Sequence, residues 1–198
     1  MLHSGDKKVL AKLAAAVAVV VVAIAVVTTV LMATADDSET LPTVSVQAGD
    51  ELVRAEPSYW CALDMTDCRP TDPRQVETLP VNVVRAPAPI GSTVLVSVPH
   101  EVAEGPWMAI AQYATPRGVY RAIDVEPSER TYTKKFPTRP DAVLLGVEVW
   151  SVSTVLQNAP DGIESLDGSI LMRGTYTIDT VPDHFQIPNS TELPDRRN

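Results

Sequence analysis

The chain has 198 residues, about the length of one domain with little to spare, and its 16 Lys and Arg against 25 Asp and Glu give a formal charge of −9. This acidic balance excludes a basic nucleic-acid-binding protein as the default class. The hydrophobic fraction of 45% is ordinary for a globular protein, but a large share of it lies before residue 36. The sequence thus divides into an apolar N-terminal segment and a mixed remainder, and no catalytic motif stands out in either.

Residues 13–35 are 23 consecutive residues without a charged side chain, mostly Ala and Val. A helix of this length spans roughly 30 Å, the thickness of the hydrocarbon core of a membrane. Lys7, Lys8 and Lys12 precede the run and acidic residues follow it, so residues 1–12 are expected to be cytoplasmic and the rest to face outward. The sequence predicts a single-pass protein of the cell membrane with an extracytoplasmic C-terminal domain.

A cleaved secretory signal is the alternative interpretation of the same segment. Ala33-Thr34-Ala35 has the small-x-small form that a signal peptidase accepts, and cleavage after Ala35 would release residues 36–198. The apolar run is longer than the roughly 7–15 residues of an ordinary signal, which favours an uncleaved signal anchor.

The two cysteines, Cys61 and Cys68, both lie in the part expected outside the membrane, where an oxidising compartment permits a disulfide. Six residues separate them, unlike the two of a thioredoxin-type motif, and no nearby His completes a zinc site. We therefore expect a structural bridge, which in the loop-entropy model stabilises the fold by about 2–3 kcal/mol.

Apolar residues that recur with a period of two predict β-strands after residue 42. Val94, Val96 and Val98 share one face of a strand, and the even-numbered residues of 170–178 share a face of another. The stretch 142–155 is expected to be a long central strand. It places Val143, Leu145, Val147 and Val149 on one face, and further strands are predicted at 43–46, 51–54, 80–84, 107–114 and 131–136.

About seven short strands without a convincing amphipathic helix predict an all-β fold. The expected architecture is an antiparallel two-sheet sandwich of immunoglobulin-like topology, preceded by one transmembrane helix. Residues 36–42 are expected to be a linker, 43–181 the sandwich domain and 182–198 a flexible tail. Trp107 and Trp150 alternate with core residues and are expected to pack in the core.

Several short stretches carry a resemblance to a known family. They are Leu41-Pro42 before Val44-Ser45-Val46, Tyr59-Trp60-Cys61 with Asp67-Cys68, Leu79-Pro80-Val81, and Val96-Ser97-Val98-Pro99 followed by Gly105-Pro106-Trp107. Over roughly residues 41–181 the chain resembles an actinobacterial family of uncharacterised envelope proteins, a domain-of-unknown-function family with a short-loop cysteine pair. The resemblance implies anchoring by one N-terminal helix or a lipid, and it implies neither an enzymatic activity nor a catalytic residue.

Candidate catalytic and metal sites fail on spacing or position. His100 begins a His-Glu-Val-Ala-Glu stretch, but the metalloprotease helix needs a second His where Glu104 stands. His184 lies in the expected tail, where no rigid surroundings would hold a general base. The acidic residues near the cysteines lack the spacing of a calcium loop. We expect no catalytic residue, no metal site and no cofactor; the acidic residues considered are Asp64, Asp67, Asp72 and Glu77.

Tyr59 and Trp60 precede Cys61 in a loop that the disulfide would pin, and two interpretations of them stay open. A rigid aromatic pair can anchor the contact with a protein partner. Alternatively, both rings cover the edge of the sandwich and the bridge.

The sequence predicts a non-enzymatic binding or accessory protein of the cell envelope, a subunit or partner of a membrane-embedded protein complex. The first 35 residues hold one acidic and three basic residues, so 24 acidic and 13 basic residues remain and give the outer part a charge of −11. This charge argues against nucleic acid as a partner, and the sequence names no small-molecule ligand. The alternative is a secreted or cell-wall-facing module that captures a ligand or glycan after cleavage; a hydrolase with an unrecognised site is a third class.

Overall fold

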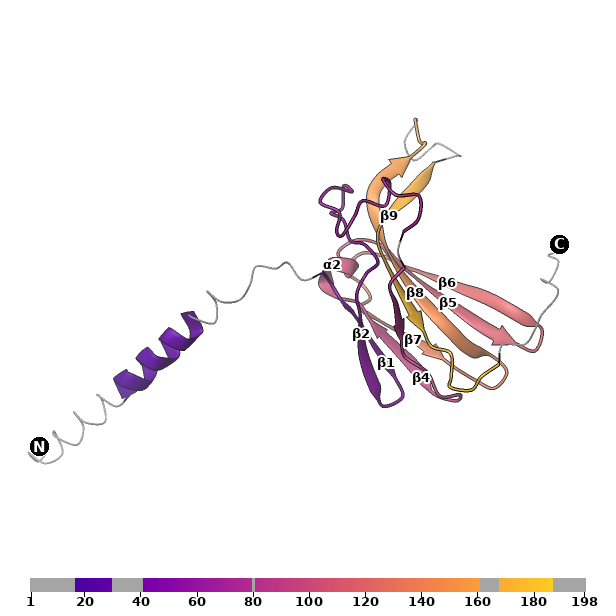
Figure 1. Ribbon diagram of the computed structural model, residues 1–198, viewed down its shortest axis with the longest axis horizontal. Coiled ribbons are helices and arrows are strands. Elements are labelled where there is room, and N and C mark those ends of the chain that lie inside the picture. Colours follow the sequence, from indigo (N-terminus) through magenta and orange to yellow (C-terminus); the bar gives the residue numbers. More distant parts are fainter. Residues whose placement is uncertain (1–16, 30–40, 80, 161–167, 187–198) are drawn as a thin grey trace, which may run out of the picture. The chain divides into compact units, whose positions relative to one another are not determined.

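The structure is a computed structural model that describes residues 17–29, 41–79, 81–160 and 168–186. The chain forms two units, Met1–Thr40 and Leu41–Asn198. The second unit is mostly β and contains two sheets (Figure 1).

In the first unit, residues 17–29 are helical. The predicted spanning segment 13–35 extends past both ends of this described helix, and the candidate cleavage sequence Ala33-Thr34-Ala35 and residues 1–12 lie outside the described residues. In the part of the chain that the structure describes, no helix combines the length and the apolar character needed to cross a membrane. The membrane anchor therefore stays a prediction.

The four-stranded sheet has the order β2-β1-β4-β7, with every neighbouring pair antiparallel. The five-stranded sheet has the order β3-β9-β8-β5-β6, in which β3 runs parallel to β9 and the other pairs are antiparallel. The elements are β1 (Val44–Ala48), β2 (Glu51–Ala55), β3 (Val83–Arg85), β4 (Thr93–Ser97), α2 (His100–Ala103), β5 (Trp107–Thr115), β6 (Gly118–Glu126), β7 (Thr133–Pro137), β8 (Val143–Gln157) and β9 (Ser169–Asp179).

The core contains side chains of both sheets, because residues that alternate along strands such as β1, β4, β5 and β8 belong to one buried cluster. Trp107 on β5 has no exposed surface, and its Nε1 donates to the Thr131 carbonyl over 3.2 Å. Tyr176 on β9 is also fully buried and donates its hydroxyl hydrogen to the Pro42 carbonyl over 2.8 Å, which fixes the start of the unit to the core. Desolvation raises the pKa of this phenol, so Tyr176 stays neutral and keeps its donor.

Trp150, which was expected in the core, is only half-buried and points to the outer side of β8. Val147 and Val149 belong to the core cluster, so the residues that alternate with them face away from it. The Trp150 Nε1 donates to Glu148 Oε2 over 3.0 Å on that outer side.

A β-bulge also changes the face pattern that the sequence predicts for β8. Gln112 on β5 pairs with Gly146, whereas Tyr113 pairs with Leu144, so β8 contains one extra residue at this point. Leu144 consequently joins the core, although strict alternation had placed it on the opposite face from Val147.

Strand β6 is absent from the predicted strands because it lies at the end of its sheet and lacks a buried face. Its exposed side chains include Ile123 and Val125, which are 60% and 65% exposed.

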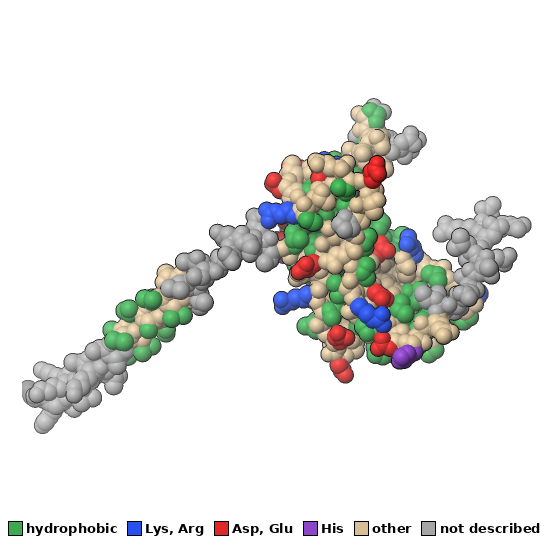
Figure 2. All heavy atoms as spheres, viewed as in Figure 1, with side chains coloured by type: hydrophobic (Ala, Val, Ile, Leu, Met, Phe, Trp, Pro, Cys, Tyr) green, Lys and Arg blue, Asp and Glu red, His purple; other side chains and the backbone are tan. Residues whose placement is uncertain are grey.

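The side of the molecule shown in Figure 2 displays acidic and basic side chains interspersed with apolar ones, without one large area of a single charge sign.

The segment after β9 begins with packed residues, in contrast to the flexible tail expected from Pro182. Pro182 is buried, and Asp183 Oδ1 accepts from Arg85 Nη2 over 2.8 Å. Residues 187–198, which make up most of the expected tail, lie outside the described part.

Candidate binding site at the disulfide loop

The segment 56–82 connects β2 to β3 and lies against β9, beside the edge that β3 occupies further along (Figure 1). The backbone NH of Ser58 donates to the Thr175 carbonyl over 2.9 Å, and that of Cys61 donates to the Arg173 carbonyl over 2.8 Å. These bonds extend the five-stranded sheet by a few residues. The connection is therefore attached to the sheet by its backbone.

The disulfide Cys61–Cys68 is confirmed, with an S–S distance of 2.07 Å. Cys61 has no exposed surface and forms a second small apolar cluster with Tyr59 and Met65. Leu171 of β9 packs against this cluster. The bridge therefore closes a loop that is itself packed on the sheet, which we call the disulfide loop (residues 61–68).

Trp60 contacts β9 at Gly174, a position where only a glycine fits. A Cβ at Gly174 would lie 2.8 Å from the indole Cζ3 and closer still to Cε3, well inside van der Waals contact. The guanidinium carbon of Arg173 lies 4.2 Å from the centroid of the indole ring, in a cation–π arrangement. The indole is thus held between a backbone without a side chain and a buried cation.

Arg173 connects this contact to α2. Its side chain is 4% exposed, and it donates to Glu104 Oε1 and to the Glu101 carbonyl, both over 2.9 Å. A guanidinium at such depth requires well-placed partners to offset its lost hydration, although the Glu104 side chain itself is 35% exposed. The carboxylate of Glu104, the carbonyl of Glu101 and the face of the Trp60 ring provide them.

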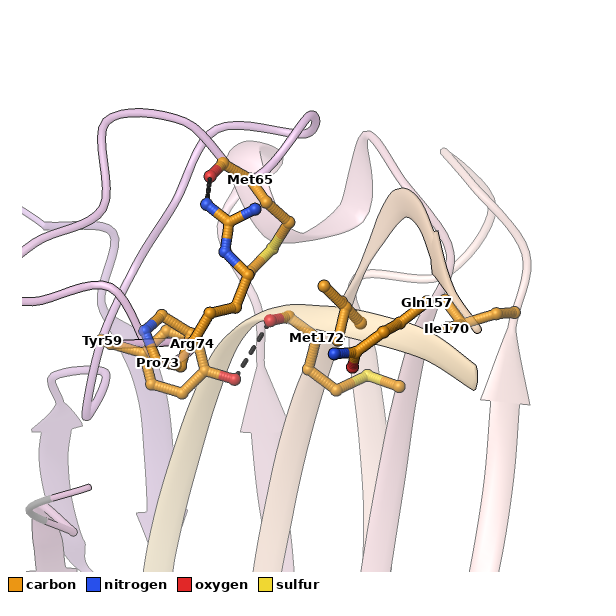
Figure 3. A pocket seen from close by; sticks show the side chains of 8 residues that line it. Tyr59, Met65, Pro73, Arg74, Gln157, Ile170 and Met172 are labelled. Atoms are coloured by element: carbon orange, nitrogen blue, oxygen red, sulfur yellow. Dashed lines mark hydrogen bonds between the residues drawn. The ribbon is translucent and has the colours of Figure 1, made fainter. Parts of the chain in front are cut away.

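A surface hollow of about 430 Å³ lies between the disulfide loop and the ends of β8 and β9 (Figure 3). Most of its wall is apolar, which is the ordinary composition of a ligand pocket. Ile170 at its rim is 51% exposed. The lining residues are Tyr59, Met65, Pro73, Arg74, Gln157, Ile170, Leu171 and Met172.

Arg74 links Met65 of the disulfide loop to Asp72 further along the same connection. Its Nη2 donates to the Met65 carbonyl over 2.6 Å (Figure 3). The same Nη2 donates to Asp72 Oδ2 over 2.7 Å, and Nε donates to Asp72 Oδ1 over 2.9 Å. These charge-assisted hydrogen bonds stabilise the ionised carboxylate and lower the pKa of Asp72 to about 2. The Arg74–Asp72 pair therefore keeps both charges through the physiological range.

Tyr59 forms part of the wall and is only 5% exposed. Its hydroxyl donates to the Met172 carbonyl over 3.0 Å (Figure 3), and desolvation raises the pKa of the phenol, so the donor is retained. Trp60 is half-buried beneath Arg173. Tyr59 and Trp60 were considered either as an anchor for a protein partner or as a cover for the sandwich edge and the disulfide. The positions of both rings favour the second interpretation, and Tyr59 also contributes one edge to the hollow.

The other residues considered from the sequence do not meet at one place. His100 begins α2, His184 lies in the turn after β9, and neither lines the hollow. Asp64 accepts from the hydroxyl of Thr66 over 2.6 Å, which is a local turn contact. Within the described ranges, no three His, Cys, Asp or Glu side chains are grouped so that they could hold a metal ion.

Arg74, Ile170 and Met172 are lining residues that the sequence analysis did not single out. Arg74 and Met172 are distant in sequence and meet only because the 56–82 connection folds onto β9. The alternation in the sequence placed Ile170 on the same strand face as Tyr176 and Ile178, which are buried, whereas Ile170 is exposed at the rim of the hollow.

A family model described as a protein of unknown function (DUF2771) matches residues 37–166 of the chain. The chain belongs to the DUF2771 family. Neither a curated protein nor a solved structure gives a significant match. The DUF2771 match includes the disulfide loop and Gln157, whereas the β9 side of the hollow, with Ile170 and Met172, lies beyond it.

Substitution Gly174→Ala is expected to lower the free energy of unfolding by about 1–3 kcal/mol, because the new methyl group overlaps the indole of Trp60. Gly105→Ala is the matched control, since a Cβ there would lie 3.6 Å from the nearest atoms, an ordinary contact. Denaturant unfolding of both variants measures the difference. Equal stability of the two variants would contradict the close packing of Trp60 on β9.

The carboxyl group of Asp72 is expected to titrate near pH 2 in the native protein. In Arg74→Gln its pKa should return toward about 3.9, whereas Arg54→Gln on β2 should leave it unchanged. Because the folded pKa is depressed, the contribution of this contact to stability is complete above about pH 4 and is lost as the pH falls toward 2. NMR titration of the side-chain carboxyl carbons tests this, and a native Asp72 titrating near 4 would refute it.

Proposed function

We propose that this protein is a non-enzymatic binding or accessory protein of the cell envelope, anchored by the 13–35 segment with the Leu41–Asn198 unit outside the cytoplasm. The uncharged run and the lysines before it support the anchor and its orientation. The Cys61–Cys68 disulfide supports an oxidising, extracytoplasmic location for the unit. The resemblance to actinobacterial envelope proteins is consistent with both.

The observation that carries the binding role is the apolar hollow beside the disulfide loop. Its volume of about 430 Å³ falls within the roughly 300–1,000 Å³ of ligand pockets. The wall is held by covalent and polar constraints: the disulfide, the Arg74 contacts and the hydrogen bond from Tyr59 to β9. A wall fixed before binding loses little conformational entropy when a partner arrives.

The occupant that we propose is an apolar side chain of a protein partner. Ile170, Leu171 and Met172 offer aliphatic and thioether surface, which attracts a group of the same kind. The amide of Gln157 at the rim can satisfy a backbone group of the partner. A protein of the same membrane would meet this site at high effective concentration.

We further propose that the two sheets form an immunoglobulin-like sandwich. In such a domain one sheet contains strands A, B and E and the other C, F and G. The order β6-β5-β8-β9-β3, and the pairing of β4 with both β1 and β7, support equating β4, β5, β7, β8 and β9 with strands B, C, E, F and G. The β1–β2 hairpin and the disulfide within a loop are departures from the usual pattern.

The anchored form predicts that protein extracted from membranes retains residues 1–35. Intact-mass measurement and N-terminal sequencing of the native protein test this directly. A mature chain that begins at Asp36 would replace the anchored protein with the secreted or cell-wall-facing alternative, in which the same hollow captures a released ligand or glycan.

A photo-crosslinking amino acid at Ile170 is expected to give a discrete adduct with a second protein in intact cells, because this rim residue is 51% exposed beside the hollow. The same probe at Leu52 on β2, which is 67% exposed, is the control and should give no such adduct. Ile170→Glu should reduce co-purification of the captured protein about tenfold, the effect of roughly 1.4 kcal/mol. Unchanged co-purification would rule out the hollow as the contact.

A further inference from the structure

The outer side of the four-stranded sheet (Figure 1) is a surface that the proposed binding site does not use. Val44, Val46, Val94 and Val96 belong to the core, so the residues that alternate with them on β1 and β4 point outward. The strand register extends this alternation to β2 and β7. We call this surface the outer sheet face; its residues are Ser45, Gln47, Leu52, Arg54, Thr93, Leu95, Ser97, Thr133, Lys135 and Pro137.

The outer sheet face carries basic but no acidic side chains. All four of its strands are described, and among their outward residues the charged ones are Arg54 and Lys135, both exposed. The outward side of the five-stranded sheet, by contrast, carries Glu148 and Asp179, which alternate with core residues of β8 and β9. The chain after residue 35 is strongly acidic as a whole. The outer sheet face is therefore positive on a unit of negative charge.

The outer sheet face combines short polar side chains with an exposed aliphatic one. The register sets Arg54 level with Ser45, Ser97 and Thr133, and the neighbouring row begins with Leu52. Leu52 is 67% exposed and lies two residues from Arg54 on the same side of β2. An apolar side chain beside a cation suits the interface of a bilayer, because the apolar group enters the acyl boundary while the cation stays among the headgroups.

The two cations stand at opposite edges of the outer sheet face, on the end strands β2 and β7. Three strand spacings of about 4.8 Å and one two-residue step of about 7 Å place the Cα atoms of Arg54 and Lys135 roughly 16 Å apart. Side chains that extend away from the sheet at this spacing do not meet on one small anion. A bilayer with anionic lipids offers a phosphate to each of them. The spacing therefore favours an extended anionic surface over a discrete ligand.

The proposed anchor brings this sheet within reach of a bilayer. The predicted span ends at residue 35 and the second unit begins at Leu41, so at most about 20 Å of extended chain separates the two positions. Strand β1 of the same sheet follows at Val44, and the hydroxyl of Tyr176 holds the Pro42 carbonyl just before it. An anionic bilayer repels the acidic sides of the unit and attracts the outer sheet face.

We propose that the outer sheet face binds the surface of a bilayer that contains anionic phospholipids. Arg54 and Lys135 bind headgroup phosphates, and Leu52 enters the acyl boundary. The inference rests on the proposed anchor, which supplies a proximity that two cations alone would not. Each cation near an anionic surface favours this orientation about fivefold, so the pair favours it about 25-fold.

Spin labelling of the full chain in vesicles tests the orientation. The vesicles contain phosphatidylcholine alone or with about 30% phosphatidylglycerol, which supplies the negative surface. A nitroxide on Leu52→Cys should shift from water to the lipid interface only in the anionic vesicles, as measured by its collisions with oxygen and with a water-soluble nickel complex. A nitroxide on Ile123→Cys is the matched control, because Ile123 is 60% exposed on the other sheet, and it should stay in water in both. Cys61 and Cys68 are joined in the disulfide and do not take the label.

Charge variants test the role of the two cations. Arg54→Glu with Lys135→Glu should abolish the shift of the label at position 52, and each single change should reduce the interfacial population at least about fivefold. Arg117→Glu with Arg121→Glu changes the net charge equally on the other sheet and should leave the shift intact. Salt of about 1 M should also remove the shift, because it shortens the Debye length to about 3 Å.

The anchor and the outer sheet face fail separately in these measurements. A chain that floats with vesicles after alkaline extraction, but whose label at position 52 stays in water, would overturn the lipid contact and leave the anchor standing. A chain that is extracted by alkali would refute the anchor; its flotation with anionic vesicles at neutral pH, lost in Arg54→Glu with Lys135→Glu, would still support the contact, and absence of that flotation would overturn it. Binding of soluble polygalacturonate to this face, with the label at position 52 in water, would replace the lipid with a glycan.

Discussion

The contact between the indole of Trp60 and the bare backbone at Gly174 determines where the disulfide loop can lie. With any side chain at Gly174 the ring could not approach β9, and the backbone hydrogen bonds of Ser58 and Cys61 to this strand would lengthen. Arg173 covers the ring and binds Glu104, so one buried cation joins the loop, β9 and α2. Tyr59, the neighbour of Trp60 in the chain, lines the hollow, so this contact lies directly beside its wall.

The disulfide and the Trp60 contact constrain different parts of the same connection. The bridge limits the conformations of residues 61–68, and in the chain-entropy model it does so mainly in the unfolded state. The Trp60 contact instead positions the folded loop on the sheet. Arg74 then joins Asp72 to the carbonyl of Met65, so the far wall of the hollow is also held. A covalent bond, packing contacts and ion pairs thus all act on this connection, whose described residues belong to no named helix or strand.

The alternation of apolar residues predicted much of the sheet structure from the sequence. Val94, Val96 and Val98, for example, share one face of a strand, and all three belong to the core. The cysteine pairing followed from compartment and spacing. Leu144 was assigned to the wrong face because its orientation depends on a bulge set by pairing with β5, which no local pattern records. Strand β6 was missed because neither of its faces is buried, so its apolar residues are interrupted by charged ones on both sides of the strand. The hollow was missed because Arg74 and Met172 meet only in the folded chain.

Strand β1 is the first strand of its unit, yet it lies inside its sheet with β2 on one side and β4 on the other. Its ladder bonds therefore run along both edges, and Tyr176 holds the carbonyl of Pro42 just before it. A mechanical load applied along β1 from the N-terminal end would have to shear both ladders together instead of opening one bond after another. Two ladders side by side thus resist such a shear load more strongly than the single ladder of an edge strand would.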